Sequence, residues 1–103
     1  MTNDTAKLGL LARIEAKPEH AQEVQDLLTG AVTLAAQETG TTVWFALRLG
    51  PTTFGVFDAF ADEEGRRAHL EGPIAKALME STPLLAEAPG IRPVDVLAAK
   101  LPA

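Results

Sequence analysis

Apolar and polar positions alternate in four short segments of the chain, and this pattern predicts four β-strands. Between residues 7 and 16, every second position is apolar: Leu8, Leu10, Ala12, Ile14 and Ala16. Residues 42–48, 53–60 and 91–100 also alternate and are rich in β-branched, aromatic or aliphatic residues. Because successive side chains of a strand point to opposite faces of a sheet, a period of two indicates strands at all four places.

A period of three to four residues predicts an amphipathic helix of about five turns from Pro18 to about Glu38. Proline suits the first turn of a helix, and Gly40 stands where a left-handed C-terminal cap is expected. Gly30 lies inside this helix. It is either simply tolerated there or marks the close approach of a backbone or a ligand.

A second helical region follows the third strand. Asp62 is a suitable N-cap because its carboxylate can accept a hydrogen bond from the first turn. The dipeptides Gly72-Pro73 and Thr82-Pro83 are expected to divide the region into three pieces, and Pro89-Gly90 closes it.

The resulting order is β-α-β-β-α-β, with Gly50-Pro51 as the turn between two adjacent antiparallel strands. Right-handed crossovers then predict the α+β ferredoxin-like arrangement, a four-stranded antiparallel sheet with both helical regions on one face. We expect a flexible N-terminus at 1–6, one domain at 7–100 and a short tail at 101–103.

The predicted sheet is apolar on both faces, apart from Arg48, Asp58 and Asp95 on the last three strands. The helices of one chain can cover only one of these faces. The simplest cover for the other is the same sheet of a second copy, which predicts a homodimer with sheet-on-sheet packing.

Composition excludes several classes of function. The chain has 103 residues, a net charge of -5 and no cysteine. An acidic surface repels phosphate backbones, so nucleic acid is not an expected partner. Absence of cysteine removes disulfides and the common zinc sites and fits a cytoplasmic protein. No run approaches the roughly 20 apolar residues that span a bilayer, so no membrane association is expected.

Four stretches resemble the antibiotic biosynthesis monooxygenase family: LLARIEAKP, EHAQEVQDLL, FGVFDAFADEEGRRAHLEGP and IRPVDVLAAKLP. The resemblance spans about residues 7–100. It implies a dimeric ferredoxin-like α+β barrel with a pocket between sheet and helices in each subunit. Some members oxidise quinols, anthrones or similar aromatics with O2 and without metal or flavin; others in the wider superfamily bind or degrade haem. Because the oxidising members use neither metal nor flavin, the resemblance to them implies no cofactor and no metal for this chain.

Oxidation of this kind needs a base that removes a phenolic proton, because a phenolate gives an electron to O2 more readily than a phenol. His69 is the first candidate, since histidine accepts a proton near neutral pH and occupies the family's Ala-His-Leu position. The alternative is a histidine paired structurally at a helix end. Asp58 is the second candidate if burial raises its pKa. The alternative is an ion pair with a strand arginine such as Arg13, Arg48 or Arg92.

Aromatic side chains are the candidate walls of a pocket for a small apolar aromatic ligand. Trp44 has a flat face for stacking and an N–H donor, and Arg48 could hold an oxyanion. Phe54, Phe57 and Phe60 complete the substrate-binding candidates. All five side chains could instead have a purely structural role, in the core, in the dimer interface or on the solvated surface. Trp44 and Phe45 point to opposite faces, and the sequence leaves open which face holds the pocket.

Departures from the family pattern bear on the activity. Oxidising members place an asparagine and a tryptophan on the third strand, where this chain has Val56 and Phe60. The haem-degrading members use an asparagine on the first strand and a histidine in the helical piece after the position of His69. Here Asn3, before the first strand, is the only asparagine, and residues 74–81 contain no histidine, so haem degradation is not expected.

Two hypotheses remain: a cofactor-independent monooxygenase for a small quinol or phenol, and a non-catalytic dimeric module that binds a small ligand or a partner.

Overall fold

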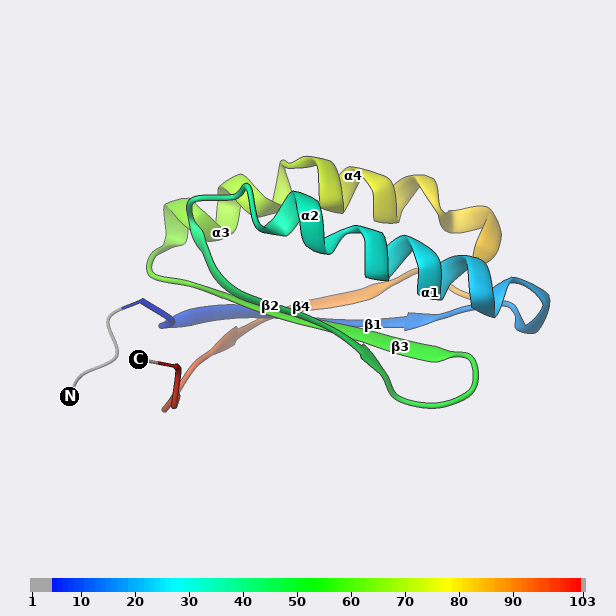
Figure 1. Ribbon diagram of the computed structural model, residues 1–103, viewed down its shortest axis with the longest axis horizontal. Coiled ribbons are helices and arrows are strands. Elements are labelled where there is room, and N and C mark those ends of the chain that lie inside the picture. Colours follow the sequence, from blue (N-terminus) through cyan, green and yellow to red (C-terminus); the bar gives the residue numbers. More distant parts are fainter. Residues whose placement is uncertain (1–4, 103) are drawn as a thin grey trace.

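A computed structural model describes residues 5–102 of the chain. Its strands are β1 (Leu8–Glu15), β2 (Thr41–Arg48), β3 (Thr53–Phe60) and β4 (Gly90–Asp95). Its helices are α1 (Ala21–Gly30), α2 (Val32–Ala35), α3 (Glu63–Leu70) and α4 (Pro73–Glu80), with 3-10 turns η1 (Pro18–His20) and η2 (Thr82–Leu84). Figure 1 shows these elements in two layers.

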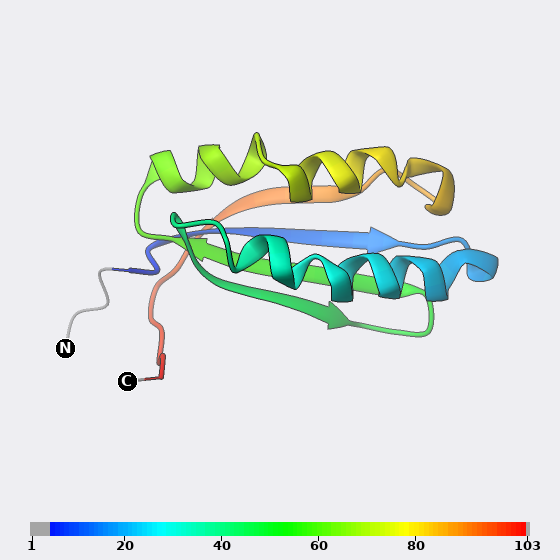
Figure 2. The same ribbon diagram turned by 45° about the horizontal axis from the view of Figure 1, so that its top comes forward.

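The strands form one antiparallel sheet in the order β2-β3-β1-β4. Both helical segments, α1 with α2 and α3 with α4, lie side by side on the same face of this sheet (Figure 2). This arrangement is the predicted ferredoxin-like α+β fold. Within residues 5–102, no helix covers the second face of the sheet.

Strand register decides which side chains lie beneath the helices. Asp58 of β3 is directly opposite Leu10 of β1 on one side and Trp44 of β2 on the other. Directly opposite residues share a face, so these three point toward the helices. Phe45 and Phe57 are likewise paired and point to the other face. The orientation that the sequence left open is therefore settled: Trp44 is on the helix side and Phe45 is not.

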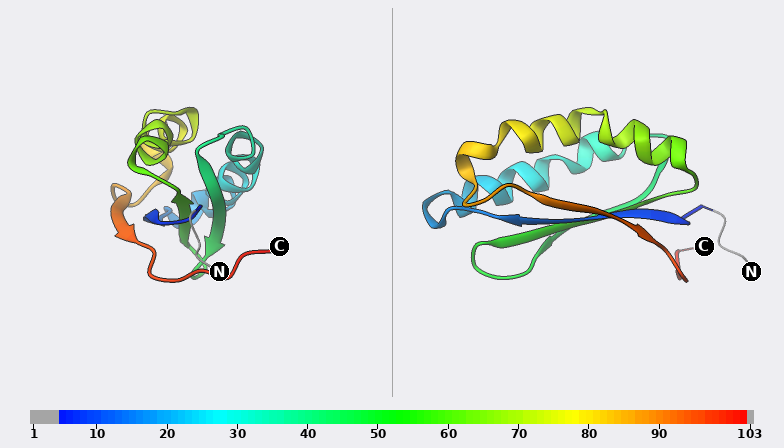
Figure 3. Two further views of the ribbon diagram at one scale, coloured as in Figure 1. Left: turned by 90° about the vertical axis from the view of Figure 1, so that its left-hand side faces the viewer. Right: turned by 180° about the vertical axis from the view of Figure 1, so that it is seen from behind.

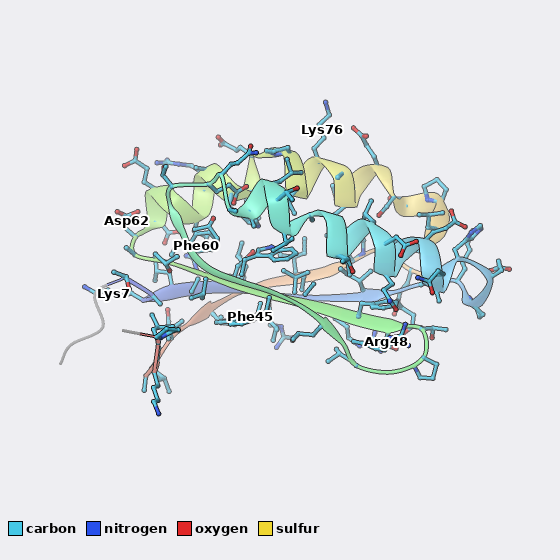
Figure 4. The ribbon with its side chains drawn as sticks, viewed as in Figure 1. Lys7, Phe45, Arg48, Phe60, Asp62 and Lys76 are labelled. Atoms are coloured by element: carbon cyan, nitrogen blue, oxygen red, sulfur yellow. The ribbon has the colours of Figure 1, made fainter. Side chains whose placement is uncertain are left out.

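The hydrophobic core fills the space between the sheet and the helices. Ile14, Val24 and Phe54 are almost completely buried at its centre. The predicted period of three to four is what places Val24 and Leu28 of α1 on the buried side of their helix. Figure 4 shows Phe60 on this side of the sheet and Phe45 on the opposite side.

Three details of the first helical segment differ from the prediction. The segment begins with a 3-10 turn and is interrupted at Ala31, so it is not one regular helix. No glycine among residues 5–102 has a positive φ angle, so Gly40 is not a left-handed cap. Gly40 is instead in close contact with the backbone of Gly65 in α3, where a Cβ atom would collide.

The second helical region agrees well with the prediction. The Asp62 carboxylate accepts a hydrogen bond of 2.9 Å from the Gly65 N–H and caps α3. The chain breaks at Gly72-Pro73 and again before Thr82, as expected.

The last strand is shorter than predicted, because β4 ends at Asp95 rather than at residue 100. Val96 makes one more hydrogen bond, to the Lys7 carbonyl, and the pairing of β1 with β4 ends where Leu8, the first residue of β1, lies opposite Asp95. The chain then turns to the side of the sheet away from the helices (Figure 3). At the other end, residues 1–4 of the expected flexible segment lie outside the described part, and Ala6 is buried.

Candidate functional site

An apolar cavity of about 210 Å³ lies between the sheet and the helices. Strands β1, β3 and β4 form its floor and helices α1, α2, α3 and α4 its sides and roof. Its apolar lining includes Leu10, Leu28, Leu34, Val56, Ile74 and Leu78. Asp58 and His69 are the two ionisable residues that line it, so any polar chemistry in the cavity takes place at these side chains.

Asp58, His69 and Glu38 form a continuous hydrogen-bonded chain, which we call the carboxylate–histidine chain. The Nε2 atom of His69 lies 2.9 Å from Oδ2 of Asp58, and its Nδ1 atom lies 2.6 Å from Oε1 of Glu38. Asp58 comes from β3, His69 from α3, and Glu38 from the segment between α2 and β2. The Asp58 and His69 side chains are 2% and 7% exposed, so this chemistry is shielded from water.

The pKa of His69 is set by opposing effects. Burial alone lowers it, since a charged ring is poorly solvated in the interior. Hydrogen bonds and charges from Asp58 and Glu38 outweigh burial and raise the pKa of His69 to about 9. At neutral pH both ring nitrogens are therefore protonated and each donates to a carboxylate. His69 in this state is an acid, and it is not available as the base.

Asp58 retains a free acceptor at the cavity. Its Oδ1 atom is buried and has no hydrogen-bond partner among residues 5–102, as is also true of Oε2 of Glu38. A buried carboxylate oxygen without a partner is costly, because it has lost water and gained nothing in exchange. A ligand hydroxyl in the cavity would provide the missing donor. The suggested ion pair of Asp58 with an arginine is wrong, because its partner is His69.

Trp44 and Arg48 lie on the helix face but do not line the apolar cavity. Trp44 packs against the core, and its buried Nε1 atom has no hydrogen-bond partner. Arg48 is exposed near the end of edge strand β2, where it donates to the side chain of Gln25 and lies over the Phe54 ring. The structure therefore does not bring either side chain together with Asp58 and His69 around one cavity.

None of the three phenylalanine candidates lines the apolar cavity either. Phe54 is buried in the hydrophobic core. Phe57 points to the face away from the helices. Phe60 is completely buried and packs against His69, with ring centroids 5.4 Å apart. Phe60 therefore supports the histidine, and the walls of the cavity are aliphatic where the sequence suggested aromatic ones.

Glu38 is the functional candidate that the sequence analysis missed, because it was counted only as the end of a helix. A signal was present: a negative charge near a helix C-terminus opposes the helix dipole and needs another reason to be there. That reason is His69, together with Thr41, whose hydroxyl donates to Glu38 Oε1 at 2.7 Å. Arg66 of α3 is only 14% exposed and donates to the Gly9 carbonyl.

Two further properties of residues 5–102 bear on function. No helix in this part of the chain is long and apolar enough to cross a membrane. The same residues contain no group of three histidine, cysteine, aspartate or glutamate side chains arranged to hold a metal ion.

Comparison with known proteins identifies the family of the chain. Residues 8–81 match the model of the antibiotic biosynthesis monooxygenase family. The chain belongs to this family. The structure of protein NE2512 from Nitrosomonas europaea, whose function is unknown, is 56% identical and has a TM-score of 0.93; the match covers 98% of this chain and 99% of NE2512. A comparison with curated proteins gives no match.

Solved structures of lower sequence identity share the fold. A candidate antibiotic biosynthesis monooxygenase from Caulobacter crescentus is 22% identical, with a TM-score of 0.77 and coverage of 91% of this chain and 92% of that one. Rv0793 from Mycobacterium tuberculosis is 14% identical, with a TM-score of 0.79 and coverage of 91% and 98%. At these identities the likeness concerns the fold alone.

Proposed function

We propose that this protein is a cofactor-independent monooxygenase that oxidises a small phenol or quinol with O2, and that Asp58 is its base. One observation carries the proposal: a buried carboxylate oxygen without a partner, Asp58 Oδ1, belongs to a side chain that lines an apolar cavity. Membership of the antibiotic biosynthesis monooxygenase family supports the type of reaction. The roles first suggested for His69 and Asp58 are thereby separated, with His69 as the group that holds Asp58 in place.

The size of the cavity indicates the size of the ligand. An apolar cavity of roughly 150 Å³ accepts a benzene molecule. The cavity here, at about 210 Å³, therefore suits a one-ring or small two-ring aromatic compound. Its aliphatic walls provide burial, while Asp58 and His69 offer the polar end that would orient a hydroxyl group.

For a phenol whose para carbon carries a hydrogen, the reaction balances without further reactants. Asp58 takes the hydroxyl proton, and the phenolate gives one electron to O2, forming a phenoxyl radical and superoxide. These combine in a C–O bond at the para carbon, and Asp58 returns its proton to form a hydroperoxide. Asp58 then removes the hydrogen of that carbon as a proton while the O–O bond breaks. The departing hydroxide takes up this proton, so that phenol and O2 yield quinone and water.

Oxygen uptake measured with phenols, naphthols and menadiol tests the proposal, and anthrones, which have three rings, serve as compounds too large for the cavity. We expect turnover above autoxidation for at least one compound and a loss of about 100-fold or more in Asp58→Asn, since a positioned base contributes 10²–10⁴ in rate. Asparagine keeps the shape and one oxygen that can accept from His69, but it cannot take a proton. Equal rates in the two proteins would overturn the role of Asp58.

A non-catalytic binding module is the alternative, and the pairing of both His69 nitrogens favours it. In this case the same aromatic compounds bind in the cavity without oxygen uptake. Calorimetry on the same panel separates the two functions, because binding with no turnover for any compound would establish the module and exclude the monooxygenase.

We further propose that two copies pair through the sheet face away from the helices. Leu11, Phe45 and Leu47 are exposed there, and Val43, Phe57 and Val94 are half-buried on the same face. An apolar patch of this kind favours association. If a two-fold axis through this face relates two copies, one contact buries the apolar patch of each copy. A second copy is therefore enough to cover the patch, and no other partner is required.

A further inference from the structure

His69 separates two hollows of the protein. On one side is the apolar cavity, and on the other a recess of about 240 Å³ at the segment between α2 and β2. Glu38 and Thr41 line this outer recess together with His69, whereas Asp58 lines only the apolar cavity. The carboxylate–histidine chain thus runs from the cavity to a second opening at the surface.

We propose that the carboxylate–histidine chain is a proton outlet, in which Glu38 passes to solvent the proton displaced when a ligand hydroxyl is ionised in the cavity. The proposal rests on the proposed function, because it takes Asp58 as the group that receives the ligand's proton. It assigns a role to Glu38, which does not line the cavity and so acts through His69.

The transfer balances in protons and charge. At rest the chain holds two protons, both on His69, and carries one net negative charge. The ligand proton moves to Oδ1 of Asp58, whose charge then no longer stabilises the imidazolium. The proton on Nδ1 of His69 passes to Glu38 and on to solvent. The chain again holds two protons, now on Asp58 and on Nε2 of His69, while the phenolate remains in the cavity and one proton has left.

The geometry of Glu38 suits this role. Its Oε1 atom lies 2.6 Å from Nδ1 of His69, and its side chain is 17% exposed, compared with 2% for Asp58. Its second oxygen, Oε2, is buried and has no hydrogen-bond partner among the described residues, so it can hold the proton until the partly exposed side chain passes it to solvent. The charged groups that act on the ring are Asp58 from β3 and Glu38 from the α2–β2 segment, while Phe60 packs against the ring without charge.

Stopped-flow absorbance with para-nitrophenol tests the outlet, because this probe changes colour when it ionises and a pH indicator reports the proton released. We expect the wild type to bind the probe as phenolate and release one proton. Glu38→Gln keeps an oxygen that accepts from His69 but cannot carry a proton. We expect it to bind the probe and release the proton about 100-fold more slowly, the lower end of the range for a positioned acid–base group.

Two further variants complete the experiment. Glu80→Gln makes the same change at an exposed glutamate of α4 and is expected to match the wild type. Glu38→Ala leaves space in the recess for a formate ion, which can carry the proton in place of the missing carboxylate. Added formate should therefore restore fast proton release in Glu38→Ala but not in Glu38→Gln. A merely structural role of Glu38 would not give this effect.

The outcomes distinguish the two proposals. A wild type that does not ionise the probe contradicts the proposed function, and with it the outlet. A wild type that ionises the probe while Glu38→Gln releases its proton equally fast overturns the outlet and leaves the role of Asp58 intact. Failure of formate to accelerate release in folded Glu38→Ala also counts against the outlet.

Discussion

Gly40 and Gly65 are in direct backbone contact: a Cβ atom on Gly40 would lie 2.9 Å from the Gly65 Cα, and one on Gly65 would lie 2.9 Å from the Gly40 carbonyl oxygen. This contact joins α3 to the segment that carries Glu38. His69 is one turn further along α3, on the same side as Gly65. The two glycines therefore set the distance across which Glu38 reaches His69.

Substitution of either glycine should destabilise the protein. Gly40→Ala and Gly65→Ala force the two backbones apart, and we expect each to cost about 1–3 kcal/mol, as overpacking does. Gly30→Ala is the matched control, because a Cβ there meets no atom within 4 Å. It should be neutral or stabilise by up to about 1 kcal/mol, since alanine favours the helix. Urea unfolding measures all three, and a Gly40→Ala protein as stable as Gly30→Ala would contradict the contact.

Stability should fall as pH rises above neutrality. The pKa of His69 is raised from 6.5 to about 9 in the folded protein, so its contribution is fully present below pH 6.5 and is lost as pH rises toward 9. We expect up to about 3 kcal/mol to be lost across this window. His69→Gln should remove the slope, whereas His20→Gln, at the other histidine, should keep it. Unchanged unfolding midpoints between pH 6 and 9.5 in the wild type would refute the assignment.

Filling the cavity should abolish ligand binding without unfolding the protein. Ala31 lines the apolar cavity, whereas the adjacent Val32 does not and is 50% exposed. Ala31→Phe is therefore expected to weaken the binding of naphthols at least about tenfold, because the ring occupies the space of the ligand. Val32→Phe adds a ring outside the cavity and should bind as the wild type does. Calorimetric titration gives both values, and equal affinities would place the ligand elsewhere.

A charge on the open sheet face should separate the proposed dimer. Phe45 and Leu47 are exposed on this face, and burying an ionised carboxylate between two sheets would remove it from water at a large cost in free energy. We expect the wild type to have the mass of two chains by light scattering at micromolar concentration, and Phe45→Glu or Leu47→Glu that of one. Met79→Glu, at an exposed position of α4, is the control and should leave the mass unchanged. A wild type with the mass of one chain would end the proposal.

Local patterns in the sequence predicted most of the fold. Each strand and helix has a period that its own residues reveal, and Asp62, Pro73 and the turn at Gly50 mark boundaries by local chemistry. Errors occurred where a neighbouring element decides the outcome. The last strand stops at Asp95 because β1 no longer accompanies it. Gly40 is a glycine because of Gly65, 25 residues further along the chain.

Local sequence patterns predicted only part of the candidate site. The sequence singled out Asp58 and His69 by residue type and position, and both line the cavity. It could not show that they bind each other, nor that Glu38 holds the other side of His69, because these contacts join three separate elements. The aromatic residues were chosen as walls because of their chemistry alone, whereas register and helix packing direct Trp44 and the phenylalanines elsewhere.

The sequence by itself determined the fold, the division of the sheet into two apolar faces and the two ionisable residues of the cavity. It did so because alternation and helical periods are properties of residues close together in the sequence. Only the tertiary structure decided that Asp58 keeps an acceptor oxygen without a partner among the described residues, whereas both ring nitrogens of His69 are paired. That result depends on distances of 2.6 and 2.9 Å between side chains of different elements, which are fixed when the helices pack on the sheet.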